Sequence, residues 1–372
     1  MDALELSREL LRLDTINPPG DERGCAEHLS RLLAGAGFDV RSYEHAPGRT
    51  SLVARLGGSS SRLPLCFAGH IDTVPLGATP WSRDPFAGEV AGGRLYGRGS
   101  SDMKSGVAAF VIAAHRLAKR LRGSPGLVLV IVAGEETGCH GSRHLTAVNG
   151  ALGEAGAIVV AEPTGNYPFV GHKGALWLHA RATGVTAHGS MPDHGINAIY
   201  KAARAVAKLE RFAFPGKQHP VLGAPTLNVG TINGGLNINS VPDGVTIGID
   251  IRTIPDVRHG ELVERLAEYL GDEVKLVPIV DVQGVWTDPA NPWMQEIFDL
   301  TTPIVGTRPV VRGAPYFTDA SALTPAYGGA PTVILGPGEM ELAHQTDEYC
   351  RVDRLEQAVE LYVEIARRWC GL

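Results

Sequence analysis

Apolar and polar positions follow two kinds of pattern along the chain. In residues 2–13 and 24–36 apolar positions recur at helical spacing, which predicts two amphipathic helices. Farther along, short apolar runs alternate with helical patterns, and such runs are typical of strands buried on both faces of a sheet. Strands alternating with helices favour a mostly parallel sheet covered by helices on both faces. We expect strands at 38–43, 51–56, 63–68, 127–133 and 157–161, a glycine- and serine-rich turn at 57–61 and a helix at 105–120.

The pattern changes between residues 174 and 282. Here the elements follow in the order β-α-β-β-α-β, which is typical of a small ferredoxin-like layer. From residue 283 the mixed α/β character returns, with a helix expected at 352–369. We therefore predict a discontinuous α/β domain, 1–173 and 283–372, with an inserted α+β domain, 174–282. The insertion is expected to hold strands at 175–182, 226–232, 244–252 and 274–280 and helices at 196–211 and 258–270.

Composition narrows the class of protein. Of the 372 residues 44% are hydrophobic and 20% are charged, which supplies enough apolar material for buried cores. The formal net charge of -6 argues against nucleic acid as a partner. The five cysteines are spread singly, as is typical of a reducing compartment. Because the apolar run 127–133 is too short to cross a membrane and the first residues are acidic, we expect a cytoplasmic protein that binds no membrane.

The first candidate for chemistry is the segment GHIDTVP at 69–75, which follows a predicted buried strand. Residues two apart on an extended chain point to the same side, so His70 and Asp72 share one face. A neutral imidazole is a good zinc ligand, and a carboxylate behind it fixes its tautomer. By itself, this short pattern fits an ordinary surface turn equally well.

Three more segments place carboxylates after strands or in glycine-rich turns, where a doubly wound sheet has its binding crevice. Two adjacent glutamates repel one another unless positive charge or solvent compensates them, so a nearby cation is a reasonable hypothesis. Taken alone, the glutamate pair fits an exposed acidic turn better. The segments are GRGSSDMKSG at 97–106 with Asp102, GEETG at 134–138 with Glu135 and Glu136, and AEPT at 161–164 with Glu162.

Together with two later segments, these motifs resemble in order the M20 family of metallopeptidases and amidohydrolases. The later segments are TAHGSMPDHGINAI at 186–199 and AHQTDEY at 343–349. The family includes acetylornithine deacetylase, succinyl-diaminopimelate desuccinylase, aminoacylase and glutamate carboxypeptidase. The resemblance covers nearly the whole chain. It implies a zinc-exopeptidase-like α/β catalytic domain with a mostly parallel central sheet, and an inserted ferredoxin-like α+β domain that serves as lid and dimerisation domain.

The resemblance also implies the residues of the site. Asp102 would bridge two metal ions, Asp72 would lie behind His70, and Glu135 would be the general acid/base. The peptide bond between Asp102 and Met103 would be cis. Five protein ligands exceed the three that one catalytic zinc usually takes, which favours two metals. The expected cofactor is two Zn²⁺ per subunit, with Co²⁺ or Mn²⁺ as possible substitutes, and the expected ligands are His70, Asp102, Glu136, Glu162 and His344.

Residues outside this cluster are expected to act on the substrate. In dimeric members of the family, the histidine that matches His188 reaches the partner's active site and polarises the carbonyl. Arg252 could hold an α-carboxylate through its two-pronged donor set, and Asn239 could donate to the substrate. Thr318 lies in the place of a substrate loop, but this chain lacks the arginine that follows that loop in typical succinyl-diaminopimelate desuccinylases. Arg312 could compensate, although a surface arginine is an equal alternative.

The expected activity is hydrolysis of the amide bond of an N-acyl-L-amino acid to a carboxylate and a free amino acid. A carboxypeptidase or dipeptidase on the same site is the alternative, and a hydrolytic deaminase or a catalytically silent binding module is more remote. A phosphate or dinucleotide site is disfavoured, because no motif of either kind opens a helix after a strand. The expected partners are a small N-acyl amino acid or dipeptide and a second copy of the chain. Cys139 and His140, beside the glutamate pair, are expected to be bystanders.

Overall fold

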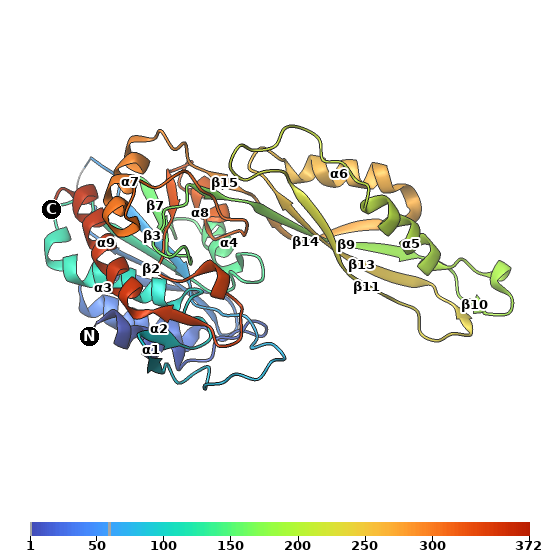
Figure 1. Cartoon of the computed structure of the whole chain (residues 1–372), viewed down its shortest axis with the longest axis horizontal. Helices are drawn as coiled ribbons and strands as arrows, with labels where there is room; N and C mark the ends of the chain where they lie inside the picture. Colours follow the sequence, from blue (N-terminus) through green and yellow to red (C-terminus); the bar gives the residue numbers. More distant parts are fainter. Residues whose placement is uncertain (1, 59–60) are drawn as a thin grey trace. The chain divides into compact units, whose positions relative to one another are not determined.

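The computed structural model describes residues 2–58 and 61–372, and these form two compact units (Figure 1). The first unit holds the chain up to residue 171 together with 286–312 and 318–372. The second unit holds 172–285 and 313–317. The short segment 313–317 joins the second unit although its sequence pattern did not separate it from the first. The predicted turn at 57–61 includes residues 59 and 60, which lie outside the described residues.

A six-stranded sheet forms the centre of the first unit. Its strands lie in the order β1-β2-β6-β3-β7-β16, and the last four run parallel to one another. The hairpin of β1 and β2 adds two antiparallel pairings at one edge. The expectation of a mostly parallel sheet is therefore confirmed. The bounds are Asp39–Ala46 for β1, Arg49–Leu56 for β2, Leu65–His70 for β3, Leu127–Val132 for β6, Ala157–Val160 for β7 and Thr332–Ile334 for β16.

Helices cover both faces of this sheet. Alternate strand residues such as Leu65 and Phe67 enter one large core with α1, α2, α3, α7 and α9. The residues between them are buried as well, and α4 and α8 contact β1, β2 and β7. Burial on both faces explains why the central strands β3, β6 and β7 are continuous apolar runs. The helices span Ala3–Leu11 (α1), Arg23–Gly35 (α2), Lys104–Leu121 (α3), His140–Ala147 (α4), Pro292–Val305 (α7), Ala320–Ala326 (α8) and Val352–Cys370 (α9).

The register of the parallel strands brings three chemically active segments to one edge. His70 ends β3 opposite Val132, the last residue of β6, and Ala68 lies opposite Val160, the last residue of β7. The segments that follow β3, β6 and β7 therefore leave the sheet side by side. Carboxyl ends of parallel strands are where such sheets carry their sites.

A smaller three-stranded sheet in the first unit has the order β17-β5-β4. It pairs Tyr349 with Tyr96, so the segment after His344 lies beside the segment that leads to Asp102. Neither this sheet nor the helices α7 and α8 had been predicted, because their apolar runs are short or interrupted by proline. The bounds are Val90–Ala91 for β4, Arg94–Tyr96 for β5 and Tyr349–Arg351 for β17. The two-residue strands β8 (Gly171–His172) and β15 (Val285–Trp286) lie where the chain passes between the units.

The second unit is a four-stranded antiparallel sheet with the order β11-β13-β9-β14 and two helices. This order and the element sequence β-α-β-β-α-β are ferredoxin-like, as predicted. The helices and the sheet enclose a core of alternate strand residues such as Leu176, Leu178 and Ile249. The bounds are Gly174–Thr183 (β9), Ala187–His188 (β10), Ala198–Leu209 (α5), Thr226–Gly234 (β11), Ser240–Val241 (β12), Gly244–Thr253 (β13), His259–Leu270 (α6) and Lys275–Val282 (β14). Within the described residues, no helix combines the length and apolarity needed to span a bilayer.

Candidate metal centre

Two clusters of nitrogen and oxygen ligands lie at the edge of the sheet where β3, β6 and β7 end. His70, Asp102 and Glu162 form the first cluster, and Asp102, Glu136 and His344 form the second. In each cluster one candidate ligand atom per residue lies within 4.8 Å of the others. Five residues separated by up to 274 positions in the sequence thus converge around Asp102.

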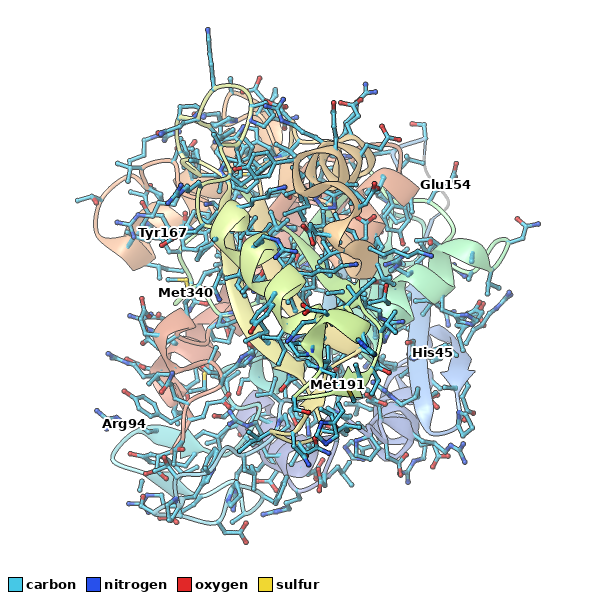
Figure 2. All side chains as sticks on the ribbon, turned by 90° about the vertical axis from the view of Figure 1, so that its right-hand side faces the viewer. His45, Arg94, Glu154, Tyr167, Met191 and Met340 are labelled. Atoms are coloured by element: carbon cyan, nitrogen blue, oxygen red, sulfur yellow. The ribbon has the colours of Figure 1, made fainter. Side chains whose placement is uncertain are left out.

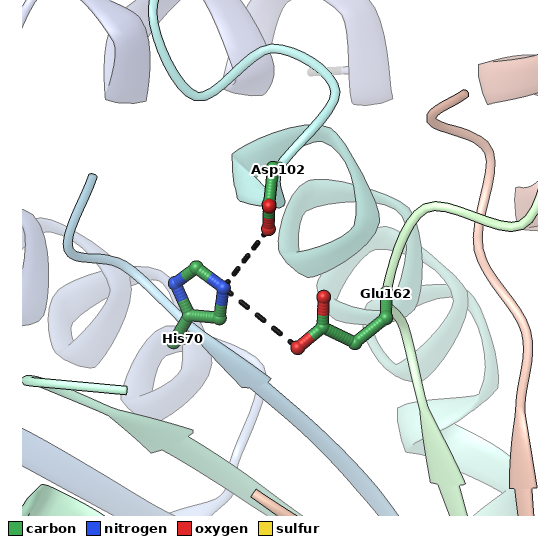
Figure 3. Close-up of side chains that lie close together, drawn as sticks. All are labelled: His70, Asp102 and Glu162. Carbon is green, nitrogen blue, oxygen red and sulfur yellow. Dashed lines mark hydrogen bonds and ion pairs between the residues drawn. The ribbon is translucent and has the colours of Figure 1, made fainter. Parts of the chain in front are cut away.

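The first cluster is closed from solvent. Nε2 of His70 lies 3.1 Å from Oδ1 of Asp102 and 3.8 Å from Oε1 of Glu162 (Figure 3). The His70 and Glu162 side chains are almost fully buried, and Asp102 is 12% exposed. All three side chains point to a common position between β3, β7 and the start of α3 (Figure 3).

The second cluster is more open. Nε2 of His344 lies 3.4 Å from Oδ2 of Asp102 and 3.1 Å from Oε2 of Glu136. The His344 side chain is half exposed, whereas that of Glu136 is buried. Because the two oxygens of Asp102 face different clusters, one carboxylate is placed to serve both. The peptide bond between Asp102 and Met103 is cis, which confirms the sequence-based prediction.

Asp72 lies behind the first cluster and also holds the glutamate pair. Its backbone carbonyl accepts a hydrogen bond from Nδ1 of His70 at 3.0 Å, which leaves Nε2 of that ring to face the cluster. Its carboxylate accepts the backbone N–H groups of Glu135 at 3.1 Å and Glu136 at 3.2 Å, and the side-chain amide of Asn17 at 2.9 Å. Asp72 therefore connects the segment after β3 to the segment after β6. Asn17 had been assigned only to a turn, because no local pattern signals a partner 55 residues away.

Charge in this region is strongly unbalanced. Five carboxylates surround the imidazoles of His70 and His344, so the net charge of the site is negative even when both histidines are protonated. The carboxylates are those of Asp72, Asp102, Glu135, Glu136 and Glu162. Burial and the carboxylate of Asp102 raise the pKa of both Glu136 and Glu162 above the usual value. Hydrogen bonds with Asp102 and Glu136 raise the pKa of His344 to about 10. Although burial opposes the charged form of Asp102, hydrogen bonds with the two histidines hold its pKa well below the usual range.

These residues fit a pair of divalent cations. Imidazole nitrogens and carboxylate oxygens are the donors that Zn²⁺ takes in catalytic sites. Oε1 of Glu136 is buried and has no hydrogen-bond partner among the described residues, as expected for an oxygen that a cation would contact. Positive charge at the two clusters would also compensate the excess of buried carboxylates. The donor set and the charge thus point to the same kind of ligand.

Glu135 is buried beside the clusters, whereas its local sequence taken alone fits an exposed acidic turn better. Burial, together with the neighbouring charges of Glu162 and Asp319, raises its pKa well above the usual value. Oε1 of Glu135 lies 3.9 Å from Sγ of Cys139, which also approaches the carbonyl of Thr318 at 3.6 Å. Cys139 therefore packs directly against the candidate acid/base and is not merely adjacent in sequence.

The predicted substrate residues of the first unit fall in two places. Thr318 is fully buried near Glu135, and its hydroxyl accepts a hydrogen bond from the backbone of Ala320. Arg312 instead lies over the ring of Tyr167, 4.4 Å from its centroid. Together with Met340 these two side chains line a cavity of about 350 Å³ (Tyr167 and Met340 are labelled in Figure 2).

Three further predicted residues belong to the second unit. His188 on β10 is exposed, and Nδ1 of its ring is 2.7 Å from the hydroxyl of Ser190. Asn239 lies next to it, because its carbonyl accepts a hydrogen bond from the backbone of Gly189 at 2.7 Å. The guanidinium group of Arg252 is already paired with Asp250 at 2.9 Å. The structure therefore brings His188 and Asn239 together beside the two-stranded sheet of β10 and β12, and it places Arg252 on β13 of the four-stranded sheet.

Comparisons with known proteins identify the family of this chain. The model of the family described as "Peptidase family M20/M25/M40" matches residues 66–368. An acetylornithine deacetylase of Vibrio vulnificus is 30% identical, and the match covers 99% of this chain and 98% of the relative. A probable succinyl-diaminopimelate desuccinylase of Staphylococcus epidermidis is 29% identical with the same coverage.

Solved structures share the fold over the full length. The M20 family metallo-carboxypeptidase Sso-CP2 from Sulfolobus solfataricus has a TM-score of 0.83 and 18% identity, with all of both chains covered. The YXEP protein of Bacillus subtilis, described as a dinuclear metal binding peptidase from the M20 family, has a TM-score of 0.72 and 15% identity, with 99% of this chain and 98% of that chain covered. The chain therefore belongs to peptidase family M20/M25/M40 and is a hydrolase of amide bonds.

Proposed function

We propose that this protein is a di-zinc amidohydrolase that cleaves an N-acyl-L-amino acid into a carboxylate and a free amino acid. The observation that carries the proposal is Asp102, whose two oxygens face two separate ligand clusters. The choice of substrate class is supported by the sequence relatives, which are named as a deacetylase and a desuccinylase.

In this proposal His70, Asp102 and Glu162 hold one zinc ion, and Asp102, Glu136 and His344 hold the other. Zinc held by these residues would supply two kinds of chemistry: polarisation of the scissile carbonyl, and a lower pKa of water so that hydroxide is available as nucleophile near neutral pH. Co²⁺ and Mn²⁺, which accept the same nitrogen and oxygen donors, are expected to substitute. Asp72 keeps the proton of His70 on Nδ1 and so leaves Nε2 free for the metal.

Glu135 is the proposed general acid/base. Its carboxylate accepts a proton from the attacking water and then delivers it to the nitrogen of the departing amine. Burial raises the pKa of Glu135, which suits a group that must both take and release a proton. Its backbone is held by the carboxylate of Asp72, so the side chain projects from a fixed turn.

The second unit is proposed to act as lid and dimerisation domain. Apolar side chains are exposed on and beside its edge strand β11, including Ile232 at 52%, Leu236 at 98% and Ile238 at 104%. Single exposed apolar residues are ordinary, but a group of them on an open strand edge fits a second copy of the chain. We propose that in the homodimer His188 and Asn239 of one subunit contact the substrate of the other. Arg252, Thr318 and Arg312 remain proposed substrate contacts.

The five cysteines are buried and none forms a disulfide, which supports a reducing, cytoplasmic location.

A substrate panel with purified protein tests the activity. Acetyl-, succinyl- and formyl-L-amino acids and dipeptides are incubated with zinc-loaded protein, and release of free amine is measured. Turnover of acyl amino acids that stops on chelation and returns with zinc supports the proposal. Turnover of dipeptides alone would make the protein a dipeptidase on the same site, and absence of all turnover would favour a binding module.

Glu135→Gln tests the assigned acid/base. The variant should still bind two zinc ions per subunit, because Glu135 is not among the proposed ligands, while activity falls by several orders of magnitude. Asp288→Asn is a matched control, since Asp288 is an exposed carboxylate that accepts one backbone N–H group. Activity near that of the unaltered protein in Glu135→Gln would remove Glu135 from this role.

A further inference from the structure

A buried ion pair lies behind the candidate metal centre and has no role in the assignments above. Arg98 and Glu348 are 1% exposed or less, and Nη1 of Arg98 donates to Oε2 of Glu348 at 2.5 Å. Arg98 precedes Asp102 by four residues, and Glu348 follows His344 by four. The pair therefore connects two segments that each carry a proposed metal ligand, across 250 positions of sequence.

Glu348 fixes the backbone that presents Asp102. Its Oε1 accepts the N–H groups of Ser101 at 2.7 Å and Asp102 at 3.0 Å, and its Oε2 accepts that of Gly99 at 3.1 Å. Converging backbone N–H groups form a cradle for an anion, and here the anion is the protein's own carboxylate. Asp102 cannot shift without breaking hydrogen bonds to a charged acceptor.

Arg98 connects the remaining segments. Its Nη2 donates to the carbonyl of Pro75 at 3.2 Å and to that of His344 at 3.4 Å. Pro75 ends the segment that begins with His70 and Asp72. One guanidinium group thus contacts the backbone of two segments that each supply a proposed ligand, and through Glu348 it is connected to the backbone before Asp102.

The burial of this pair is hard to explain by stability alone. Two charges removed from water gain little net free energy from their attraction, and apolar residues of similar size often stabilise a core as well. A planar guanidinium and a carboxylate do, however, fix several backbone groups in defined positions. The benefit of keeping the pair is therefore geometric.

The pair contacts the two clusters unequally. In the first cluster it touches the backbone of one ligand, Asp102. In the second cluster it touches the backbone of two of the three ligands, Asp102 and His344. Displacement of these segments should therefore disturb the second cluster more than the first.

We propose that Arg98 and Glu348 are positioning residues that set the spacing of the two metal ions, and that the ion at Asp102, Glu136 and His344 depends on them more than the other ion does. The proposal rests on the proposed di-metal function. Groups that orient metal ligands from behind typically change metal affinity 10- to 100-fold when they are substituted.

The test is zinc binding by metal-stripped protein, measured by calorimetric titration against a competing chelator. Glu348→Gln keeps the side-chain shape but turns one acceptor oxygen into an amide that faces N–H donors. We expect two zinc ions to bind the unaltered protein, and the affinity of the second cluster to fall roughly 10- to 100-fold in the variant. In a His344→Ala background, which leaves the first cluster complete, Glu348→Gln should weaken binding by less than about threefold, well below that range.

A second variant covers the case in which Glu348→Gln does not fold. Arg98→Lys keeps a positive charge beside Glu348 but cannot reach the carbonyls of Pro75 and His344 together. The zinc affinity of the second cluster should fall by about 10-fold in this variant, which is the lower end of the range for such groups. Glu360→Gln is the control, because it breaks an exposed pair with Arg116 on the same unit and should leave both affinities unchanged.

The outcomes separate this proposal from the function on which it rests. If the unaltered protein binds no zinc, both fail. If it binds two ions and the Glu348 and Arg98 variants bind them as tightly, the positioning role is wrong and the di-metal function stands. Equal weakening of both clusters in proportion to lost thermal stability would also overturn the proposal, because it would show a merely structural role.

Discussion

Asp72→Asn offers a demanding test of how the metal centre is built. The carboxylate accepts three N–H groups, from Glu135, Glu136 and Asn17, and it lies 3.5 Å from Nδ1 of His70. Asparagine offers one oxygen, so its amide must face at least one N–H donor. Orientation of His70 and of the glutamate pair should therefore loosen together.

The magnitude follows from these contacts. Loss of a group that orients ligands lowers metal affinity 10- to 100-fold, which corresponds to about 1.4 to 2.7 kcal/mol. A hydrogen bond to a charged group contributes about 1.5 to 3 kcal/mol to stability. In metal-free protein, however, removing one of five crowded carboxylates relieves repulsion and offsets part of that loss. We therefore expect the metal-free variant to lose less stability than the zinc-loaded one.

The assay combines zinc titration with thermal unfolding, each with and without chelator. Asp288→Asn, at an exposed carboxylate with a single backbone partner, is the control and should change neither quantity. The reasoning is refuted if Asp72→Asn binds zinc within about twofold of the unaltered protein, since a 10-fold loss is the smallest expected from a true orienting group.

Further predictions concern pH and packing. In metal-free protein the pKa values of Glu135, Glu162 and His344 are raised in the folded state, so folding takes up protons. Stability should therefore fall as pH rises above 4.5 for the two glutamates, and from 6.5 to about 10 for His344. Zinc binding replaces those protons, so zinc should raise the unfolding temperature more at pH 8 than at pH 5.5. Calorimetry measures both shifts, and equal shifts at the two pH values would contradict the prediction. Gly106→Ala in α3 would place a methyl 2.2 Å from the carbonyl of Ala161, and urea unfolding should show a loss of about 1–3 kcal/mol. The methyl group added by Gly260→Ala in α6 meets no atom within 4 Å, so the free energy of unfolding should rise by about 0.5–1 kcal/mol. A lower free energy of unfolding would show that helix propensity does not govern stability at this position.

The order of elements could be predicted from the sequence because burial leaves a repeating signal. The ferredoxin-like order of the second unit and the buried strands β3, β6 and β7 follow directly from apolar periodicity. Strand ends were less predictable. β3 continues two residues past its expected end, to His70, because its polar end still pairs with β6. Pairing partners, rather than local composition, decide where a strand stops.

The candidate ligands could be predicted only from several motifs taken together. His70 with Asp72 fits a surface turn, and Glu135 with Glu136 fits an exposed one, yet the structure buries His70, Asp72 and Glu135. Their motifs resemble one family in the same order, and this resemblance favoured a shared buried site over separate surface turns. The substrate residues have no comparable local signal, and their roles stay predictions.

The sequence by itself determined most of the elements, the family and the candidate metal ligands, because periodicity and short motifs are local properties. Only the tertiary structure showed that the two oxygens of Asp102 face different clusters and that Asn17, Arg98 and Glu348 hold the segments in place. The contacts of Asn17 with Asp72 and of Arg98 with Glu348 join residues that are 55 and 250 positions apart. Hydrogen bonds of a few ångströms between distant segments depend on how the sheet is assembled, and no local pattern records them.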